Sequence, residues 1–478
     1  MINRTGKIVW LLILSYFAVF GTIAAFRHYS FQTQAWDMGI FIQTFWNAAN
    51  GNGLVNSLEE IPHTFGVHFS PWLYALMPGY IIFPSPYYLL LVQALALALG
   101  AWPLFLLARR ILKEEKWALL IAASYLLYPS LHWVNLFDFH SVAFLVPLLL
   151  AAFYFSETKQ WGWAGLFLLL SASTREDSIL AVIFVGLYYL VKKTGDGAPR
   201  WNAARKFGLA VTLLATLYFL LSIYVFMPYF GGGLLRLDRY AQFGETPVEI
   251  VKTLVINPSL LASTIFTVEK FRYALWLFLP LAFLPFFSGR AVLLLLPGLA
   301  ENLLTNNASQ FSGFYQYDSV LVPVIFFTVI LGLKRIMEKW PQHQRAARRL
   351  LIAAIALGYL VRSPINPVFF PVGIFQSNPR IEAFRKIVNL ASKNPNISVA
   401  AQTNLVPHLA NRKEIYMLGT EPRPADVVLI DGADLSFFAS EELFNAYADS
   451  YINSGNYEIN SLDNRYLILF RKELLKTE

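Results

Sequence analysis

Long apolar runs follow one another between residues 8 and 361, and the charge of the gaps between them alternates. Lysine and arginine collect in every second gap, whereas carboxylates and histidines collect in the others. A helix needs about 20 apolar residues to cross the hydrocarbon core of a bilayer. The pattern therefore predicts a chain that crosses a membrane many times, with one chemically distinct set of loops on each side.

The composition supports this interpretation and excludes several classes of protein. Of the 478 residues, 56% are hydrophobic and only 14% are charged, which indicates that lipid is the main solvent. The net charge of +8 does not predict a nucleic-acid partner, because the cations lie at the ends of apolar runs, where orientation and anionic headgroups explain them. The chain has no cysteine, so disulfides, thiolate metal sites and a cysteine nucleophile are excluded.

The apolar runs predict a polytopic α-helical membrane protein with about 11 transmembrane helices, some of them short for a bilayer. The predicted spans are residues 8–26, 87–108, 117–134, 141–157, 161–174, 178–191, 207–227, 273–288, 291–305, 319–333 and 350–361. The apolar run at 71–83 is below spanning length and is predicted to lie in the membrane interface.

The distribution of cations predicts the orientation. About 19 Lys and Arg residues lie in one set of gaps and about seven in the other, and membrane insertion retains the richer loops in the cytoplasm. The first run follows Arg4 and Lys7 and lacks a clear cleavage site, so we interpret it as a retained signal anchor. We expect a multi-pass protein of the cell (inner or plasma) membrane with a cytoplasmic N-terminus.

A change of pattern after residue 361 predicts a second domain. Prolines at 364, 367, 371 and 379 end the apolar region, so 1–361 is the predicted transmembrane domain and 362–478 a small soluble α/β domain outside the cell. Its predicted strands are 398–401, 415–418, 426–430 and 466–470, and its predicted helices are 380–392 and 441–454.

The first outer loop contains a candidate catalytic carboxylate. Asp37 opens a predicted helix in which Met38, Phe41 and Phe45 share one face, so the helix is expected to lie in the interface with Asp37 at the membrane surface. Capping of the helix N-terminus by Asp37 is the alternative. The same loop carries three further candidates, Trp36, His63 and His68.

A second outer segment pairs a carboxylate with an imidazole. In a turn, Asp138 and His140 can point into one cavity, whereas a helix would separate them around its axis. A divalent metal held by this pair with His63 or His68 stays open, because imidazole and carboxylate suit such ions, although no established ligand spacing is present. Capping and hydrogen bonding of isolated His and Asp explain the same residues.

A third segment places Arg175, Glu176 and Asp177 in succession at the outer end of a span. Charges at membrane depth are expensive, so they pair or serve function. A structural salt bridge from Arg175 to Glu176 or to a neighbouring span is the competing explanation.

A fourth outer segment is polar and aromatic, without Lys or Arg. Its candidates are Glu301, Tyr315 and Tyr317, because aromatic faces with polar donors suit a sugar or a headgroup, although tyrosine is also common at membrane interfaces.

The loop at 228–272 is the outer stretch of the membrane region where cations collect. A glycine run precedes four candidates for a lipid phosphate, Arg236, Arg239, Lys270 and Arg272. Snorkelling of each cation to headgroups is the alternative.

These segments together resemble a known family. The motifs are Trp36-Asp-Met-Gly-Ile-Phe41, His68-Phe-Ser-Pro71, Leu106-Leu-Ala-Arg-Arg110, Asn135-Leu-Phe-Asp-Phe-His140 and Arg175-Glu-Asp177. Their order over about the first 360 residues resembles a prokaryotic family of uncharacterised predicted membrane proteins. That family is similar to the GT-C glycosyltransferases, which include protein O-mannosyltransferases and lipid A aminoarabinose transferase.

The resemblance implies an enzyme that takes a sugar from a polyprenyl-phosphate carrier and transfers it to an extracytoplasmic lipid, glycan or protein. Asp37 matches the catalytic carboxylate of the first outer loop, which acts as base on the acceptor hydroxyl. No second acidic residue stands beside it, which weakens the case for a metal ion held there. We assign Asp138, His140, Glu176 and Asp177 as helpers, with membrane lipids, the lipid-linked donor and the acceptor as partners.

The sequence leaves two other classes of protein open. A multi-span transporter or lipid flippase also needs many spans and buried charge, but its ionisable residues usually lie at the bilayer midplane, whereas these lie at one face. A non-catalytic scaffold that presents the C-terminal domain would leave the polar outer segments without a role.

Overall fold

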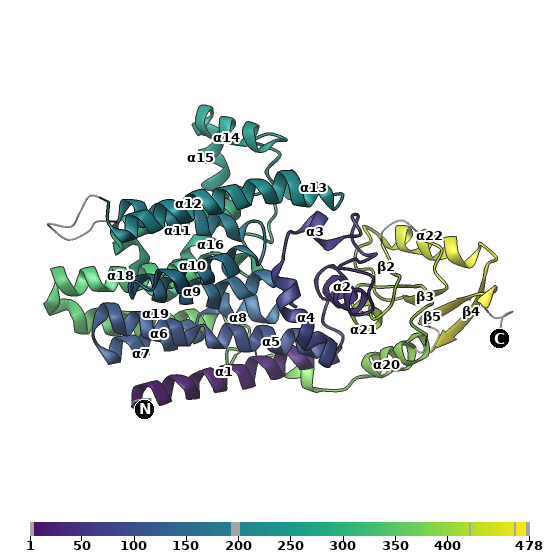
Figure 1. Cartoon of the computed structure of the whole chain (residues 1–478). Helices are drawn as coiled ribbons and strands as arrows, with labels where there is room; N and C mark the ends of the chain where they lie inside the picture. The colour runs from purple at the N-terminus through teal and green to yellow at the C-terminus, as the bar shows by residue number, and fades with distance from the viewer. Residues whose placement is uncertain are drawn as a thin grey trace. The chain divides into compact units, whose positions relative to one another are not determined.

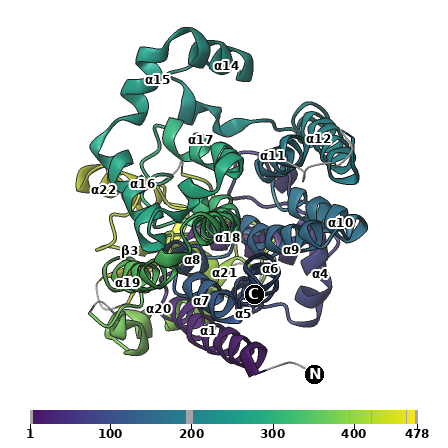
Figure 2. The ribbon, with the colours of Figure 1, turned by 90° about the vertical axis from the view of Figure 1, so that its left-hand side faces the viewer.

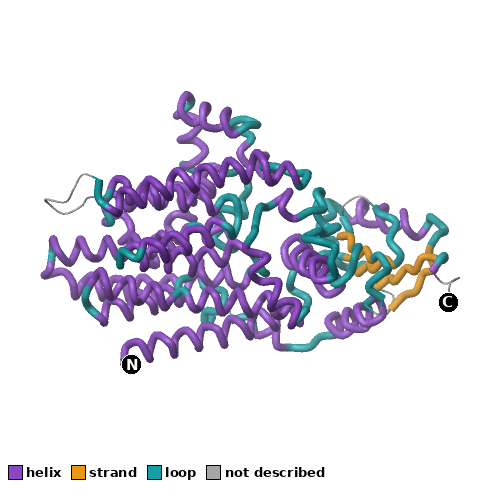
Figure 3. Tube along the Cα trace, viewed as in Figure 1, coloured by secondary structure: helices purple, strands orange, loops and turns teal. Residues whose placement is uncertain are grey.

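The computed structural model describes residues 4–192, 201–368, 370–392, 394–419, 422–462 and 465–474. The chain is mostly helical, with one sheet near its C-terminus (Figures 1 and 3). It forms two compact units. Unit 1 consists of Met1–Thr22, His68–Leu73 and Leu91–Pro371, and unit 2 consists of Ile23–Val67, Tyr74–Leu90 and Val372–Glu478. The division into a membrane domain, 1–361, and a soluble domain, 362–478, stays a prediction.

Unit 1 is a helical bundle. Its helices are α6 (Ala101–Leu112), α7 (Glu115–Leu126), α8 (Pro129–Leu136), α9 (Leu145–Glu157), α10 (Trp161–Ala172), α11 (Ser178–Val191), α12 (Ala203–Leu221), α13 (Met227–Tyr229), α14 (Pro247–Ile256), α15 (Pro258–Ile265), α16 (Val268–Phe278), α17 (Leu296–Leu304), α18 (Leu321–Lys339) and α19 (Gln344–Arg362). Short helical turns join them: η2 (Ser141–Phe144), η3 (Ser222–Phe226), η4 (Leu235–Tyr240), η5 (Leu279–Leu281), η6 (Leu284–Phe287), η7 (Gly289–Leu295), η8 (Gln316–Ser319) and η9 (Pro341–His343). The helices α1 (Arg4–Tyr29), α4 (Trp72–Ile82) and α5 (Pro86–Leu99) pass from one unit to the other.

Small residues let the helices of unit 1 approach closely. A methyl group at Gly208 of α12 would lie 2.7 Å from the carbonyl oxygen of Gly186 in α11, so neither position accepts a larger side chain without a shift. Helix α18 is buried from Leu321 to Ile330 and contacts α6 and α9 (Figure 2). These contacts make α18 the core of the bundle.

Three helices among the described residues are long and apolar enough to cross a membrane: Arg4–Tyr29, Pro86–Leu112 and Ala203–Tyr229. The number rises to five if each of two bent pairs, α7 with α8 and α14 with α15, counts as one span. Several predicted spans correspond to apolar helices of 10–17 residues, among them α9, α10 and α11. The prediction of about 11 crossings therefore stays a prediction.

The predicted spans 273–288 and 291–305 are among those that are not continuous helices. The segment 273–288 ends its α-helix at Phe278 and continues in η5 and η6, because Pro280 and Pro285 lack the backbone donor that a helix needs. The segment 291–305 begins as η7 and becomes helical at Leu296. Gly332 of α18 accommodates the broken segment, since a methyl group there would lie 2.2 Å from the carbonyl oxygen of Leu284.

Unit 2 is built on a five-stranded mixed sheet. Its strands are β1 (Val399–Ala401), β2 (Ile415–Met417), β3 (Val427–Asp431), β4 (Tyr457–Leu462) and β5 (Tyr466–Arg471), in the order β2-β1-β3-β5-β4. Strand β1 is parallel to β2 and β3, and β5 is antiparallel to β3 and β4. Buried Val428, Ile430 and Leu469 pack with Phe444 and Tyr451 of α22 (Glu441–Ile452). The predicted strands and helices of this region are confirmed, and β4 is an additional strand.

The sheet packs with the loop between α1 and α4 inside unit 2. The loop forms a π-helical turn, η1 (Ala35–Gly39), followed by α2 (Ile40–Ala49) and α3 (Thr64–Val67), and the C-terminal residues add η10 (Val372–Phe375), α20 (Pro379–Ala391) and α21 (Val406–Leu409). The Ser57 hydroxyl donates to the Ile415 carbonyl (2.7 Å) and accepts from its N–H (2.9 Å), which pairs the edge strand β2.

Helix α2 differs from the expectation of an interfacial helix. Ile42, Gln43 and Phe45 are all fully buried, and Gln43 donates to the carbonyl of Lys413 (2.9 Å). The apolar face packs inside unit 2 because the C-terminal residues cover it, so the prediction that α2 lies against lipid was wrong. Helix α4 does leave Tyr74, Ile81 and Ile82 exposed.

Candidate functional site

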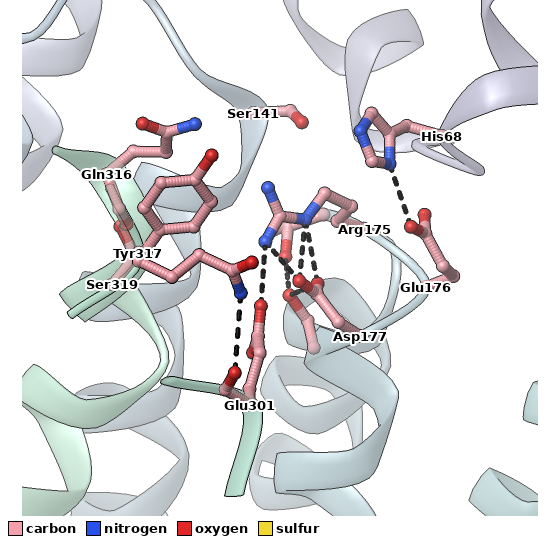
Figure 4. A network of polar contacts seen from close by, with 12 residues as sticks. His68, Ser141, Arg175, Glu176, Asp177, Glu301, Gln316, Tyr317 and Ser319 are labelled. Carbon is pink, nitrogen blue, oxygen red and sulfur yellow. Dashed lines mark hydrogen bonds and ion pairs between the residues drawn. The ribbon is translucent and has the colours of Figure 1, made fainter. Parts of the chain in front are cut away.

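A buried guanidinium organises the junction of α10 and α11. Arg175 lies in the turn between these helices and is 8% exposed. Its Nε donates to both carboxylate oxygens of Asp177 (2.9 and 2.8 Å), its Nη2 pairs with the same carboxylate, and Nη2 lies 3.6 Å from Oε1 of Glu301 (Figure 4). Arg175 therefore joins the third and fourth predicted segments, which are about 125 residues apart.

The balance between burial and the attraction of opposite charges keeps both Arg175 and Asp177 ionised. Burial opposes ionisation of Asp177, but the adjacent Arg175 guanidinium outweighs it and holds the pKa of that carboxyl below its usual value. Burial also disfavours the Arg175 cation, and Asp177 again outweighs it, so the pKa of Arg175 is raised. The salt bridge expected as an alternative is thus present, and its partners are Asp177 and Glu301 of α17 rather than Glu176.

Glu176 faces the other way and binds the end of the first outer loop. Its Oε1 lies 2.8 Å from Nδ1 of His68, and its Oε2 accepts from the backbone N–H of Phe69 (3.0 Å) (Figure 4). Close by, the hydroxyls of Ser70 and Ser141 lie 3.2 Å apart. The segment that begins at His68 therefore touches both the second and the third predicted segments.

A buried glutamine holds the second segment. The Gln93 side chain of α5 donates to the carbonyl of Asp138 (2.7 Å) and accepts from the N–H of His140 (2.8 Å). Asp138 has a φ of +44°, and both it and His140 are buried. The rings of Phe137 and Tyr315 pack edge to face at 4.5 Å, which brings the second segment against the fourth.

The fourth segment also binds the cationic loop. Arg239 of η4 donates from Nη1 to the Gln310 side chain (3.2 Å) and lies 3.5 Å from the Tyr317 hydroxyl, with its guanidinium 5.7 Å from that ring. The Tyr240 hydroxyl donates to the Glu301 carbonyl (2.9 Å). Figure 4 shows Glu301 and Tyr317 beside Arg175, on the opposite side from Glu176.

The other three predicted phosphate ligands differ in how exposed they are. Arg236 and Arg272 are exposed. Lys270 is 4% exposed, and its ammonium donates to the carbonyls of Thr264 (2.9 Å), Leu303 (2.7 Å) and Thr305 (3.0 Å). Since an ammonium has three donors, Lys270 is fully used in joining α15 to α17. We therefore remove Lys270 from the phosphate-binding set.

Asp37 belongs to unit 2, where the C-terminal residues hold its segment. It is half-buried in η1, the third residue of that turn, so it does not cap a helix. The cap comes from a distant residue: the Thr403 hydroxyl accepts from the N–H of Ala35 (3.1 Å) and donates to Gln34 Oε1 (3.0 Å). Gly39 lies against Val406, since a methyl group at Gly39 would be 2.9 Å from that side chain. Unit 2 thus fixes both ends of η1.

Two further candidates lie in the same unit. Trp36, next to Asp37, is 37% exposed. His63 accepts at Nδ1 from the N–H of Phe65 (3.1 Å), and burial lowers the pKa of its imidazole. That contact gives His63 a local structural role.

The described residues contain no group of three or more His, Cys, Asp or Glu side chains that could hold a metal ion. The divalent metal left open by the sequence thus has no matching donor set in the described part of the chain, and we place no step through a metal.

Sequence reasoning missed two positioning residues. Gln93 stands out as a strongly polar side chain in the middle of an apolar run, and buried polar groups are almost always hydrogen-bonded, so its position was a usable signal. Thr403 has no comparable signal, because its partners Ala35 and Gln34 lie 368 and 369 residues away.

Comparisons with known proteins agree with this architecture. A family model described as "Predicted membrane protein (DUF2079)" matches residues 27–468. The chain is similar to the crystal structure of ArnT from Cupriavidus metallidurans bound to undecaprenyl phosphate, with a TM-score of 0.54 and 11% identity over 98% of both chains. No curated protein sequence matches. At this identity the likeness shows the fold alone, which this chain shares with that protein over nearly its full length.

Proposed function

Because the chain belongs to the DUF2079 family of predicted membrane proteins and has the fold of ArnT, we propose that it is a GT-C-type membrane glycosyltransferase. The donor is a sugar linked to a polyprenyl phosphate, and the acceptor is an extracytoplasmic lipid, glycan or protein. One observation carries the proposal: segments near residues 68, 138, 175, 239 and 301 meet around Arg175 and Tyr317. The undecaprenyl phosphate named with ArnT supports the class of carrier.

The proposed reaction is a single displacement. The acceptor oxygen bonds to the anomeric carbon, its proton passes to the Asp37 carboxylate, and the bond from that carbon to the phosphate oxygen breaks with inversion. The leaving phosphate keeps the electron pair. Arg239 and Arg236 stabilise its charge, because guanidinium groups match phosphate oxygens.

The remaining groups bind the sugar and the acceptor. Glu176, Asp177 and Glu301 offer acceptors to sugar hydroxyls, while Tyr315 and Tyr317 offer ring faces. Arg175 and Thr403 are positioning residues, since Arg175 orients Asp177 and Thr403 caps the turn that carries Asp37. Asp138 and His140 act as helpers of the catalytic base, and His63 and His68 line the acceptor side in this proposal.

The test is transfer by the purified full chain in lipid vesicles, with a panel of radiolabelled polyprenyl-phosphate sugars. We expect product with at least one donor and about a 100-fold or larger loss in Asp37→Asn, because a general base contributes at least that factor. Glu60→Gln is the matched control, as Glu60 is an exposed carboxylate of the same loop. Transfer by Asp37→Asn at the wild-type rate would remove Asp37 from the mechanism.

A multi-span transporter or lipid flippase is the second candidate. The breaks between α7 and α8 (42°) and between α14 and α15 (98°) favour it, because transporters use interrupted helices. Uptake of a lipid-linked sugar into vesicles without transfer from any donor would support this candidate over the glycosyltransferase.

The proposed orientation places the N-terminus in the cytoplasm and the C-terminal residues outside. Cysteines introduced at the exposed positions Lys116 and Ser436 test it cleanly, because the chain has none of its own. We expect an impermeant thiol reagent added to intact cells to label position 436 and not position 116.

A further inference from the structure

The chain that follows the spanning segment Ala203–Tyr229 forms a sharply bent helical hairpin, α14 with α15, whose axes differ by 98°. Each helix has its own N-terminal cap. Thr246 and Glu249 form a reciprocal capping box on α14, and the Asn257 side chain accepts from the N–H of Leu260 on α15. Pro258 at the start of α15 cannot continue the preceding helix. The bend is therefore encoded in the sequence.

The hairpin exposes a contiguous apolar surface, and contact between such a surface and water is unfavourable. Neither helix has a buried residue. Val248, Val251 and Val255, spaced along one face of α14, are 73%, 62% and 75% exposed. Ile256 and Phe266 are 66% and 84% exposed. Together the two helices are long and apolar enough to cross a membrane, as Ala203–Tyr229 is.

The hairpin lies at the level of a helix that also leaves its apolar side chains exposed. Only 22% of the most apolar stretch of Ala203–Tyr229 is buried, and Leu213 and Leu214 in it are 61% and 66% exposed. Figure 1 shows the hairpin level with the middle of α12 rather than beyond either end, and Figure 2 shows the two apart from each other at the periphery of the bundle, with α17 next to the hairpin. The hairpin thus exposes its apolar surface at the same level of the bundle as α12 exposes its own.

We propose that the α14–α15 hairpin is a re-entrant element whose Val251 and Val255 face contacts the hydrocarbon of the bilayer. Its charges are compatible with that environment. The Glu249 carboxylate accepts from the backbone N–H groups of Glu245 (2.9 Å) and Thr246 (3.3 Å), which disperses its charge. Lys252 is exposed and has a stem long enough to carry its ammonium toward headgroups.

The hairpin is anchored to the helix that carries Glu301. The buried Lys270 ammonium donates to Thr264 at the end of α15 and to Leu303 at the end of α17. Lipid contact at the hairpin therefore fixes the depth of α17 and of Glu301 relative to the bilayer. The lipid contact itself does not depend on the proposed function.

The test uses single-cysteine variants of the full chain in phosphatidylcholine–phosphatidylglycerol vesicles, labelled with a small environment-sensitive fluorophore. Val251→Cys and Val255→Cys are compared with Leu214→Cys, a lipid-facing control, and with Glu458→Cys, an exposed control on strand β4. Quenching by acyl-chain nitroxide lipids and by aqueous iodide is measured for each.

We expect nitroxide lipids to quench positions 251 and 255 as strongly as position 214, and iodide to quench them at least threefold less than position 458. Equal iodide quenching at 251, 255 and 458 would place the hairpin in water and overturn the proposal. Protection from both quenchers would also overturn it, since protein would then cover the face.

Discussion

Replacing Thr403 with valine tests whether the C-terminal residues hold the Asp37 segment. The substitution keeps the branched shape of the side chain and removes the hydroxyl that accepts from Ala35 N–H (3.1 Å) and donates to Gln34 Oε1 (3.0 Å). Thr403 is 4% exposed and Ala35 is 1% exposed, so water cannot easily replace the lost acceptor. The half-buried Gln34 can turn to solvent.

The expected magnitude follows from these two bonds. Loss of a typical hydrogen bond costs about 1 kcal/mol, and a buried N–H left without an acceptor costs about 1–3 kcal/mol. Taking the middle of the range for the buried N–H, we expect the substitution to destabilise the folded segment by about 2 kcal/mol. That value corresponds to about a 30-fold increase in the equilibrium for local opening of η1.

Hydrogen exchange measured by mass spectrometry reads this opening directly. We expect peptides that cover residues 34–40 to exchange about 30-fold faster in Thr403→Val, while peptides from α18 in unit 1 keep the wild-type rate. Thr403→Ser retains both hydrogen bonds and is the matched control, with exchange close to wild type. Equal exchange in the wild type and the valine variant would refute the role of Thr403 as a cap.

Three more substitutions probe other contacts. Gln93→Leu removes the two hydrogen bonds that the Gln93 side chain makes with the Asp138 carbonyl and the His140 N–H. We therefore expect the free energy of unfolding to fall by about 2–4 kcal/mol, with a lower unfolding midpoint in detergent. An unchanged midpoint would contradict the role of Gln93. Arg175→Lys keeps a positive charge but loses the planar fork that lowers the pKa of Asp177. The pairing stabilises the fold above the ordinary Asp pKa and is lost as pH falls through the depressed one, so on titration from pH 7 to pH 3 the lysine variant should unfold at a higher pH; coincident curves would argue against this coupling. Burial lowers the pKa of His408 well below 6.5, so the unfolded chain takes up a proton that the folded one does not, and stability of unit 2 falls below pH 6.5 by at most about 1.4 kcal/mol per pH unit. His408→Phe should flatten that slope between pH 7.5 and 5.5, and an identical slope would show that another group titrates.

The sequence predicted elements where local pattern decides the structure. Alternating apolar residues predicted β1, β2, β3 and β5, but β4 was missed, because its exposed positions carry Glu458, Asn460 and Ser461, which are poor strand formers. Helix 273–288 was expected from hydropathy, and Pro280 breaks it. The hydropathy of a segment shows that it is long and apolar, but it does not show whether every residue can donate the backbone hydrogen bond that a continuous helix needs.

The candidate site was predictable only in part, for a similar reason. Alternating charge grouped residues such as Glu176 and Glu301 with outward-facing segments before any contact was known. It could not identify which side chains pair across the fold, because the contacts of Arg175 with Glu301, of Lys270 with Leu303 and of Thr403 with Ala35 are set by packing between distant segments. The location of Asp37 in unit 2 depends on such contacts as well.

The most direct measurement compares donor binding with sugar transfer on the same preparations of wild type, Asp37→Asn and Arg239→Gln. If Asp37 is the base and Arg239 binds the phosphate, Asp37→Asn binds the polyprenyl-phosphate sugar with near wild-type affinity but transfers it about 100-fold more slowly. Arg239→Gln then loses about tenfold or more in donor affinity. Undiminished transfer by Asp37→Asn, or undiminished donor binding by Arg239→Gln, would contradict the proposed division of roles.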